Sequence, residues 1–402
     1  MLAKTRIFEQ AQSSLATFLT SVIVLKSLDA KYVSEFYIGT TGCQAAFALL
    51  SARVVTPIVA SQVDVRYTPT CVRRLLSRAW LFGLPVATVA YLSTTHLRLA
   101  SVVNDVREWL VLVVYCAALL GFEILRRLAA TRDFTQDASA LLVAQAARLA
   151  SPLVLLSLWT ASSLSWWSFF AVLCAFLTLG TWILARTLIR SVGTCRYVDL
   201  VRSTAGSLPS WSNSIAEGLT IVAWAHVPVF LLAYVAGSAA VAQLVAVRTP
   251  VSFFNVVLEY VEVHTRRYAF GRLWRERRSL LVAIAIVFWM VTSAALYLCA
   301  PVLIRVIATG TYTGARVELV LFWLLQLAIL VDKVTFNEQR RLAPKTMALS
   351  SSLIFALGST AIAYVLISFG ATAGAITAMV LWCSANVAAR RTHLSPHVQT
   401  AG

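Results

Sequence analysis

Charged residues are scarce in this chain of 402 residues. Only 13% of the residues are Asp, Glu, Lys or Arg, whereas 59% are hydrophobic, and the mean hydropathy is +0.78. In a typical soluble domain, about a quarter of the residues are charged. No stretch between the apolar segments is long enough to form a separate soluble domain. These shortages exclude a soluble globular protein and predict an all-α polytopic membrane protein.

Motifs for catalysis and for metal or nucleotide binding are also missing. The chain has no H-E-x-x-H, no G-x-S-x-G and no phosphate-cradling glycine loop. Its seven cysteines form no C-x-x-C pair, which argues against a disulfide framework and a zinc site. We therefore expect no enzyme, no cofactor and no metal. Without a nucleotide site, any transport would be driven by an ion gradient, the membrane potential or the gradient of the substrate.

What the chain does have is a series of apolar segments, each close to the roughly 20 residues that cross a bilayer as a helix. Twelve such spans are predicted, at 12–28, 36–60, 76–94, 108–125, 139–160, 165–186, 211–234, 238–261, 280–303, 317–335, 347–368 and 372–389.

Basic residues outnumber acidic ones by 34 to 17, and their placement is uneven. Most lie at the N-terminus and in the gaps after the even-numbered spans, with Arg126 and Arg127 among those after the fourth span. Short loops rich in Lys and Arg stay in the cytoplasm, so both termini are predicted to be cytoplasmic. Because these charges lie beside apolar spans, they suit anionic membrane lipids rather than a nucleic-acid partner.

The connection at 191–210 divides the predicted spans into six plus six. Its Gly193, Gly206 and Pro209 suit a linker. We expect an N-terminal six-helix bundle at 1–190, a cytoplasmic linker at 191–210 and a C-terminal six-helix bundle at 211–402.

The two halves have similar patterns, which predicts two pseudo-symmetric bundles around a cavity. On one face of the first span and of the seventh, polar residues recur at intervals of four and three residues. The span that follows each of them has an arginine a few residues before a proline. Serine and threonine stripes also serve ordinary helix packing in lipid. The stripes contain Gln10, Ser14, Thr17 and Ser21, then Asn213, Glu217, Thr220 and Trp224, and the pairs are Arg53 with Pro57 and Arg248 with Pro250.

Three arginines lie inside predicted spans, namely Arg53, Arg148 and Arg248. An arginine in the hydrocarbon core is costly, so it usually faces a cavity or a partner. Arg248 begins a polar face that continues through Ser252, Asn255, Glu259 and Glu262, which indicates either a wet pathway or an internal Arg–Glu pairing between bundles. Arg53 and Arg148 lie about two turns from a span end and could also snorkel to the interface.

Glu217, His226 and Glu259 are the candidates for ion coupling. A carboxylate with little solvent could bind a proton or sodium, or it could pair with an arginine. A lone histidine within a span is more often a hydrogen-bonded packing residue than a proton carrier.

Three segments of the chain carry a resemblance to a known family: Ile7–Ser21, Leu28–Gly39 and His226–Arg248. They resemble the first two helices, and the corresponding part of the second half, of the multidrug/oligosaccharidyl-lipid/polysaccharide (MOP) export superfamily, within it the polysaccharide flippases. The resemblance implies a cavity lined by the first, second, seventh and eighth helices. It implies a flippase that moves a lipid-diphosphate-linked oligosaccharide across the bacterial inner membrane, with membrane lipids, a polysaccharide polymerase and export machinery as partners.

Other functions fit parts of the pattern. A cation-coupled multidrug exporter of the same superfamily would have the same topology. A major-facilitator-type transporter also has six plus six spans, but its loop after the second span carries glycines that Val63–Arg74 lacks. A membrane-embedded polymerase or glycosyltransferase would need larger outer loops. A silent scaffold would have the same composition.

Overall fold

A computed structural model describes residues 2–60, 69–94, 106–131, 135–161, 165–190, 211–258, 261, 271–308, 315–342 and 349–399, at some helix ends only as backbone. The regular secondary structure of these residues is all helical. The helices of the first half are α1 (Leu2–Ser27), α2 (Ala30–Ala60), α3 (Pro69–Thr94), α5 (Val106–Thr131), α6 (Thr135–Ala161) and α7 (Trp166–Arg190). Those of the second half are α9 (Trp211–Ala225), α10 (Val227–Val251), α12 (Gly271–Ile307), α13 (Arg316–Leu342) and α14 (Leu349–Gln399).

The longest helix, α14, is two helices that fold back on each other. Its 51 residues would extend about 76 Å as one helix, far beyond a bilayer core of about 30 Å. The helical backbone is broken at Gly370 and Ala371, where Ala371 has φ 41°. Beyond the break, Gly374 contacts the backbone of Leu366 so closely that it has no room for a Cβ atom. In a continuous helix these two residues would lie about 12 Å apart along the axis, so the chain reverses here.

A second reversal occurs inside α10, at Gly237. This glycine has φ 80° and ψ −177°, a conformation that L-residues with a side chain rarely adopt. His226, before the break, and Ser252, after it, line the same cavity, although a continuous helix would separate them by about 39 Å. The two reversals touch, because the Thr372 hydroxyl donates a hydrogen bond of 3.1 Å to the Ala240 carbonyl oxygen. The breaks lie between the predicted spans 211–234 and 238–261, and between 347–368 and 372–389.

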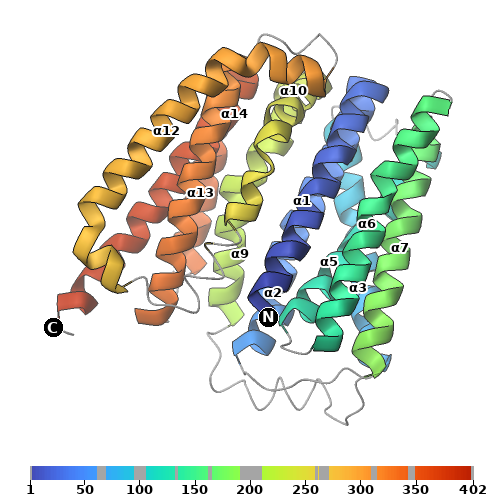
Figure 1. Cartoon of the computed structure of the whole chain (residues 1–402), viewed down its shortest axis with the longest axis horizontal. Helices are drawn as coiled ribbons and strands as arrows, with labels where there is room; N and C mark the ends of the chain where they lie inside the picture. Colours follow the sequence, from blue (N-terminus) through green and yellow to red (C-terminus); the bar gives the residue numbers. More distant parts are fainter. Residues whose placement is uncertain are drawn as a thin grey trace.

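The helices pack as two groups that follow the two halves of the chain (Figure 1). Within the first group α6 packs on α1 and α7, and α5 packs on α3 and α7; within the second, α14 packs on α9, α10 and α13. Helix α2 joins the groups by packing on α9 and α10, and α1 contacts α10. At this junction the backbones approach closely, because a Cβ atom added at Gly218 of α9 would lie only 3.2 Å from the Ala48 carbonyl oxygen. The predicted linker at 191–210 lies outside the described residues.

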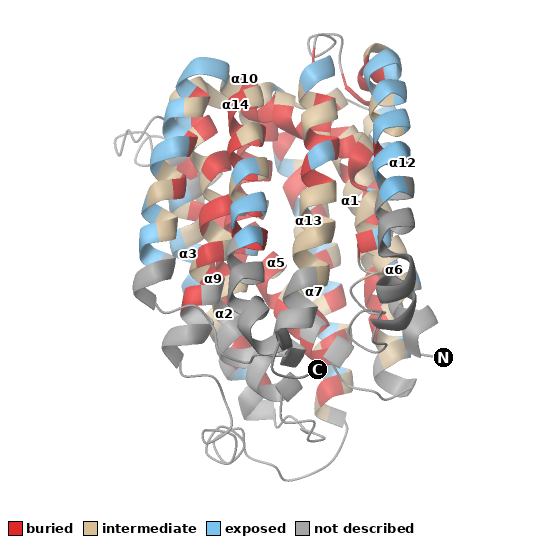
Figure 2. Cartoon of the chain, turned by 90° about the vertical axis from the view of Figure 1, so that its left-hand side faces the viewer, coloured by how far each residue is buried: buried red, intermediate tan, exposed pale blue. Residues whose placement is uncertain are grey.

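The outer surface of the helices is apolar. Large exposed hydrophobic side chains lie on the outside of α12, α14, α3, α6 and α7, and the outward face of α12 is exposed along much of its length (Figure 2). Six segments of the described residues are long and apolar enough to cross a membrane, namely Val106–Arg126, Ala138–Thr160, Trp166–Ile189, Gly218–Val251, Ile286–Ile307 and Leu353–Ala388. Apolar faces of this extent are solvated by lipid, so the chain is a multi-pass membrane protein.

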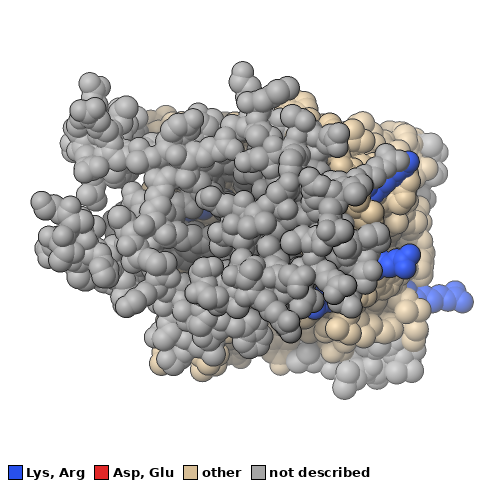
Figure 3. Space-filling view, turned by 90° about the horizontal axis from the view of Figure 1, so that it is seen from below, with Lys and Arg blue, Asp and Glu red and all other residues tan. Residues whose placement is uncertain are grey.

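The start of α1 and the end of α14 lie toward the lower end of the molecule in the view of Figure 1. Seen from that end, the visible charged side chains of the described residues are Lys and Arg (Figure 3). That this end is cytoplasmic stays a prediction from the sequence.

Candidate functional site

The candidate site is a cavity of about 90 Å³ at the junction of the two groups of helices. Side chains from α1, α2, α5, α6 and α7 line it on one side, and side chains from the second part of α10 and the turn that follows line it on the other. Arg148 and Arg248 are its charged lining residues, and no Asp, Glu or Lys of the described chain lines it. A ligand in this cavity therefore meets a guanidinium group from each half of the protein, and the one of Arg148 also contacts Glu123.

Arg248 reaches the cavity from α10. Its Nη1 donates a hydrogen bond of 2.6 Å to the Tyr37 hydroxyl of α2, and its guanidinium carbon lies 5.2 Å from the centre of the same ring. No carboxylate of the described residues forms an ion pair with it. Because an arginine has five N–H donors, Arg248 keeps donors for a ligand after the bond to Tyr37 is made.

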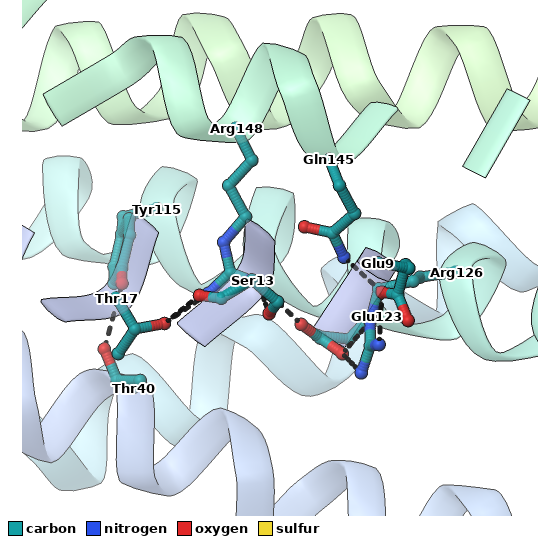
Figure 4. A network of polar contacts seen from close by, with 9 residues as sticks. All are labelled: Glu9, Ser13, Thr17, Thr40, Tyr115, Glu123, Arg126, Gln145 and Arg148. Atoms are coloured by element: carbon teal, nitrogen blue, oxygen red, sulfur yellow. Dashed lines mark hydrogen bonds and ion pairs between the residues drawn. The ribbon is translucent and has the colours of Figure 1, made fainter. Parts of the chain in front are cut away.

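Arg148 reaches the cavity from α6 and ties three helices together (Figure 4). Its Nη1 lies 3.2 Å from the Ser13 hydroxyl and 3.3 Å from Oε1 of Glu123, and its Nη2 lies 3.4 Å from the Thr17 hydroxyl. These distances are long for charge-assisted hydrogen bonds, which are usually about 2.7–2.9 Å. The contacts of Arg148 are thus longer than those of the ion pairs beside it, at 2.8 Å.

A compact ion-pair network lies next to Arg148 (Figure 4). Arg126 of α5 binds Glu9 of α1 at 2.8 Å and Glu123 at 2.8 Å, and Gln145 of α6 donates to Glu9 at 2.6 Å. Arg126 is 7% exposed and Glu9 is 4% exposed. The two glutamates balance the two arginines, so the network is neutral and the buried charges are paired.

The position of Arg126 differs from the sequence-based expectation. The sequence pattern places it in the basic gap after the fourth span, where a cation would face water. In the structure α5 continues to Thr131, and Arg126 points into the protein between two carboxylates. Its counter-ion Glu9 is 117 positions away in the sequence, so only the tertiary fold shows the pairing.

The remaining cavity wall is rich in hydroxyl and aromatic groups. Thr17, Thr20, Ser21, Ser151, Thr249 and Ser252 contribute hydroxyls, and Phe36, Tyr37, Tyr115 and Phe176 contribute aromatic rings. The Thr40 and Tyr115 hydroxyls lie 2.9 Å apart and fix each other. Such a wall offers hydrogen bonds to a polar ligand and flat apolar faces to its rings.

Three of the predicted site residues, Thr17, Arg148 and Arg248, meet at this cavity. Ser14 is buried at 4% exposure with an unpartnered hydroxyl, and it does not line the cavity. Gln10 is partly buried and does not line it either. The predicted stripe on α1 is therefore divided between the cavity and the interior.

The predicted residues of the second half are placed differently. The Thr220 hydroxyl is buried and bonds to the Ala216 carbonyl oxygen of its own helix at 2.9 Å. His226 lines a second cavity, of about 150 Å³, rather than the first. The side chains of Arg53, Asn213, Glu217 and Glu259 lie outside the described residues.

Sequence reasoning missed Glu9, Glu123 and Tyr37. Glu123 and Arg126 are three residues apart on α5, a spacing at which opposite charges pair on one helix face, and this signal was available. Glu9 and Tyr37 had no such local signal, because their partners are on other helices.

The comparisons with known proteins found similar solved structures but no match by sequence. No family model matches the sequence, and no curated protein matches it. A solved structure described as the inward-facing conformation of a multidrug resistance MATE family transporter of the MOP superfamily is similar, with a TM-score of 0.56, 11% identity, and coverage of 97% of this chain and 96% of that one. A second, described as MATE in the bent conformation, has a TM-score of 0.49 at 12% identity, covering 99% of this chain and 95% of that one. The first likeness shows that the chain shares this fold over nearly its whole length.

Proposed function

We propose that this protein is a MOP-superfamily transporter that moves a lipid-diphosphate-linked oligosaccharide across the bacterial inner membrane by alternating access. In this proposal twelve transmembrane helices form two six-helix bundles joined by the linker at 191–210, and both termini are cytoplasmic. The fold shared with a MATE transporter and a cavity at the junction of the bundles support a transporter. The charge of that cavity supports the cargo.

The observation that carries the proposal is the presence of two cavity arginines without a cavity acid. Arg148 and Arg248 line the cavity from opposite halves, and no carboxylate of the described residues lines it. A guanidinium presents paired N–H donors that match phosphate oxygens. A cation in this cavity would instead be repelled, and the low dielectric of a buried site strengthens that repulsion.

The hydroxyl and aromatic wall suits the sugar part of such a substrate. Hydroxyls such as those of Thr17, Thr249 and Ser252 can exchange hydrogen bonds with sugar hydroxyls, and Phe36 and Tyr37 offer flat faces. The cavity therefore suits a phosphorylated sugar head group, with the lipid chain remaining in the bilayer.

One other function has support of its own. The similar structure is named a multidrug resistance transporter, which favours a cation-coupled drug exporter of the same superfamily. That function would use acids, and Glu217 and Glu259 remain predictions because their side chains lie outside the described residues. His226 likewise remains a candidate for ion coupling. The major-facilitator alternative is not carried forward, because the observed fold likeness is to the MOP superfamily.

A reconstituted transport assay tests the proposal. The full chain is placed in liposomes, and the transbilayer movement of a fluorescent polyprenyl-diphosphate saccharide is compared with that of the same glycolipid lacking phosphate and with a cationic dye. We expect only the diphosphate lipid to move. Arg248→Gln is expected to slow it about ten- to a hundredfold, because hydrogen bonds to charged groups contribute about 1.5–3 kcal/mol.

Arg305→Gln is the matched control, because Arg305 is exposed on α12 and lines neither cavity. It should transport like the unmodified protein, and Arg248→Lys should fall between the two. Equal movement of the phosphate-free glycolipid would refute the role of the arginines. Movement of the cationic dye without movement of the lipid would establish the drug-exporter alternative instead.

A further inference from the structure

We infer that the second cavity, between α2 and the C-terminal group of helices, is a binding site for a small inorganic anion of the hydrogen-phosphate type. The inference concerns a different ligand from the proposed transport function and does not rest on it, although the two cavities share Arg248. The cavity has a volume of about 150 Å³, and α2, α9, α10, α13 and α14 contribute its lining.

Buried polar atoms without a partner mark this cavity as a site. Three of its lining residues have such an atom: the Thr41 hydroxyl, the indole N–H of Trp224 and the side-chain oxygen of Gln326. These residues are only 2%, 7% and 5% exposed. An unsatisfied buried polar group destabilises a protein, because it has given up its hydrogen bonds to water without replacement. Three such groups belong to residues that line one space, and a polar ligand in that space would supply the partners that they lack.

The charges around the cavity select an anion. Arg248 is the charged residue that lines it, and no Asp or Glu of the described chain does. Its donors include the Arg248 guanidinium, the Trp224 N–H and the Thr41 hydroxyl. The Gln326 oxygen is an acceptor, so the best ligand both accepts and donates hydrogen bonds. Hydrogen phosphate does both, because its oxygens accept and its P–OH donates.

The same arginine lines the candidate substrate cavity, so the two cavities share one guanidinium. Tyr37, Gln44, Arg248 and Ser252 line both of them. The hydrogen bond from Arg248 to Tyr37, at 2.6 Å, holds the side chain at this boundary. An anion that draws Arg248 toward the second cavity lowers the positive charge available in the first. The second site would thus compete with the first for its cation, and such coupling acts equally in both directions.

Phosphate binding to the purified full chain tests the site without any lipid substrate. Equilibrium dialysis with radiolabelled inorganic phosphate should show saturable binding to one site per chain. Thr41→Val and Trp224→Phe remove one donor each with little change in shape, and each should weaken binding about tenfold. Arg248→Gln should remove measurable binding, since it deletes the charge. Chloride, which only accepts hydrogen bonds, should displace phosphate poorly.

Thr20→Val is the matched control, because Thr20 is also a buried threonine but lines only the first cavity. It should bind phosphate as the unmodified protein does. The inference is overturned if the unmodified protein shows no saturable binding below about 10 mM phosphate, a concentration at which only very weak binding would escape detection. It is equally overturned if Thr20→Val weakens binding as much as Thr41→Val. If the cavity variants do not fold, the measurement on the unmodified protein alone decides.

Discussion

Glu123 is the residue whose neutralisation should most destabilise the N-terminal group of helices. Its carboxylate binds Arg126 at 2.8 Å and Arg148 at 3.3 Å, so it is shared by two guanidiniums. Glu123→Gln keeps the shape but removes one negative charge. Glu9 alone would then balance both arginines, and it contacts only Arg126 of the two.

The size of the effect follows from burial. Removing one partner of a buried ion pair costs about 3–5 kcal/mol, because the remaining charge stays in a low dielectric. Arg126 keeps its contact with Glu9, so the charge left without an ion-pair partner is Arg148, whose side chain is 19% exposed, and the cost should lie near the lower end of this range. Glu108 provides the comparison: it binds Lys31 at 2.8 Å, but the Lys31 side chain is 41% exposed. Exposed pairs contribute about 0–1 kcal/mol, so Glu108→Gln should cost no more than that.

Unfolding in mixed micelles measures the difference. Increasing amounts of a denaturing detergent unfold each variant, and a thiol-reactive dye reports the exposure of the buried cysteines Cys43, Cys116 and Cys383. The double variant with Arg148→Gln should recover part of the loss, because it restores the balance of charge. A free energy of unfolding for Glu123→Gln within about 0.5 kcal/mol of that for Glu108→Gln would refute the assignment of a buried network.

Two further predictions concern the helix reversals. Gly374→Ala should abolish the monodisperse peak in size-exclusion chromatography, because the added Cβ would overlap the Leu366 carbonyl group. Gly358→Ala is the control and should elute normally, since the nearest neighbour of its added Cβ is the Trp382 ring at 3.6 Å. A normal peak for Gly374→Ala would contradict the close packing of the hairpin. Thr372→Val should lower the free energy of unfolding by about 1 kcal/mol through loss of the hydrogen bond to Ala240. No change in the same detergent titration would show that the contact between the reversals is not stabilising.

The helix breaks could be predicted from the sequence because they depend on residues close together in the chain. A helix must end within the thickness of a bilayer, and glycine is the residue that most readily adopts the backbone angles seen at Gly237. The gaps predicted at these places therefore coincide with the reversals in α10 and α14. The reversal in α14 also uses Ala371, at φ 41°, which no local rule would select.

The arginines inside predicted spans show what a local sequence pattern can predict and what it cannot. The high cost of a charge in hydrocarbon predicts that Arg148 and Arg248 face a cavity or a partner, and both line the candidate site. The sequence left open whether Arg248 pairs with an acid. Its contact in the described structure is the Tyr37 hydroxyl, on a helix 211 positions away.

Sequence alone determined the class of this protein, because hydropathy and charge placement are properties of consecutive residues and the bilayer acts on them directly. It predicted gaps that coincide with the reversals in α10 and α14, and it placed Arg148 and Arg248 within spans, but it misplaced Arg126. Only the tertiary structure decided which charges meet. It paired Arg126 with Glu9 across α1 and α5, and it brought arginines from the two halves to one cavity. Such contacts depend on how the helices pack. Packing between side chains of distant segments produces no periodic pattern in the sequence.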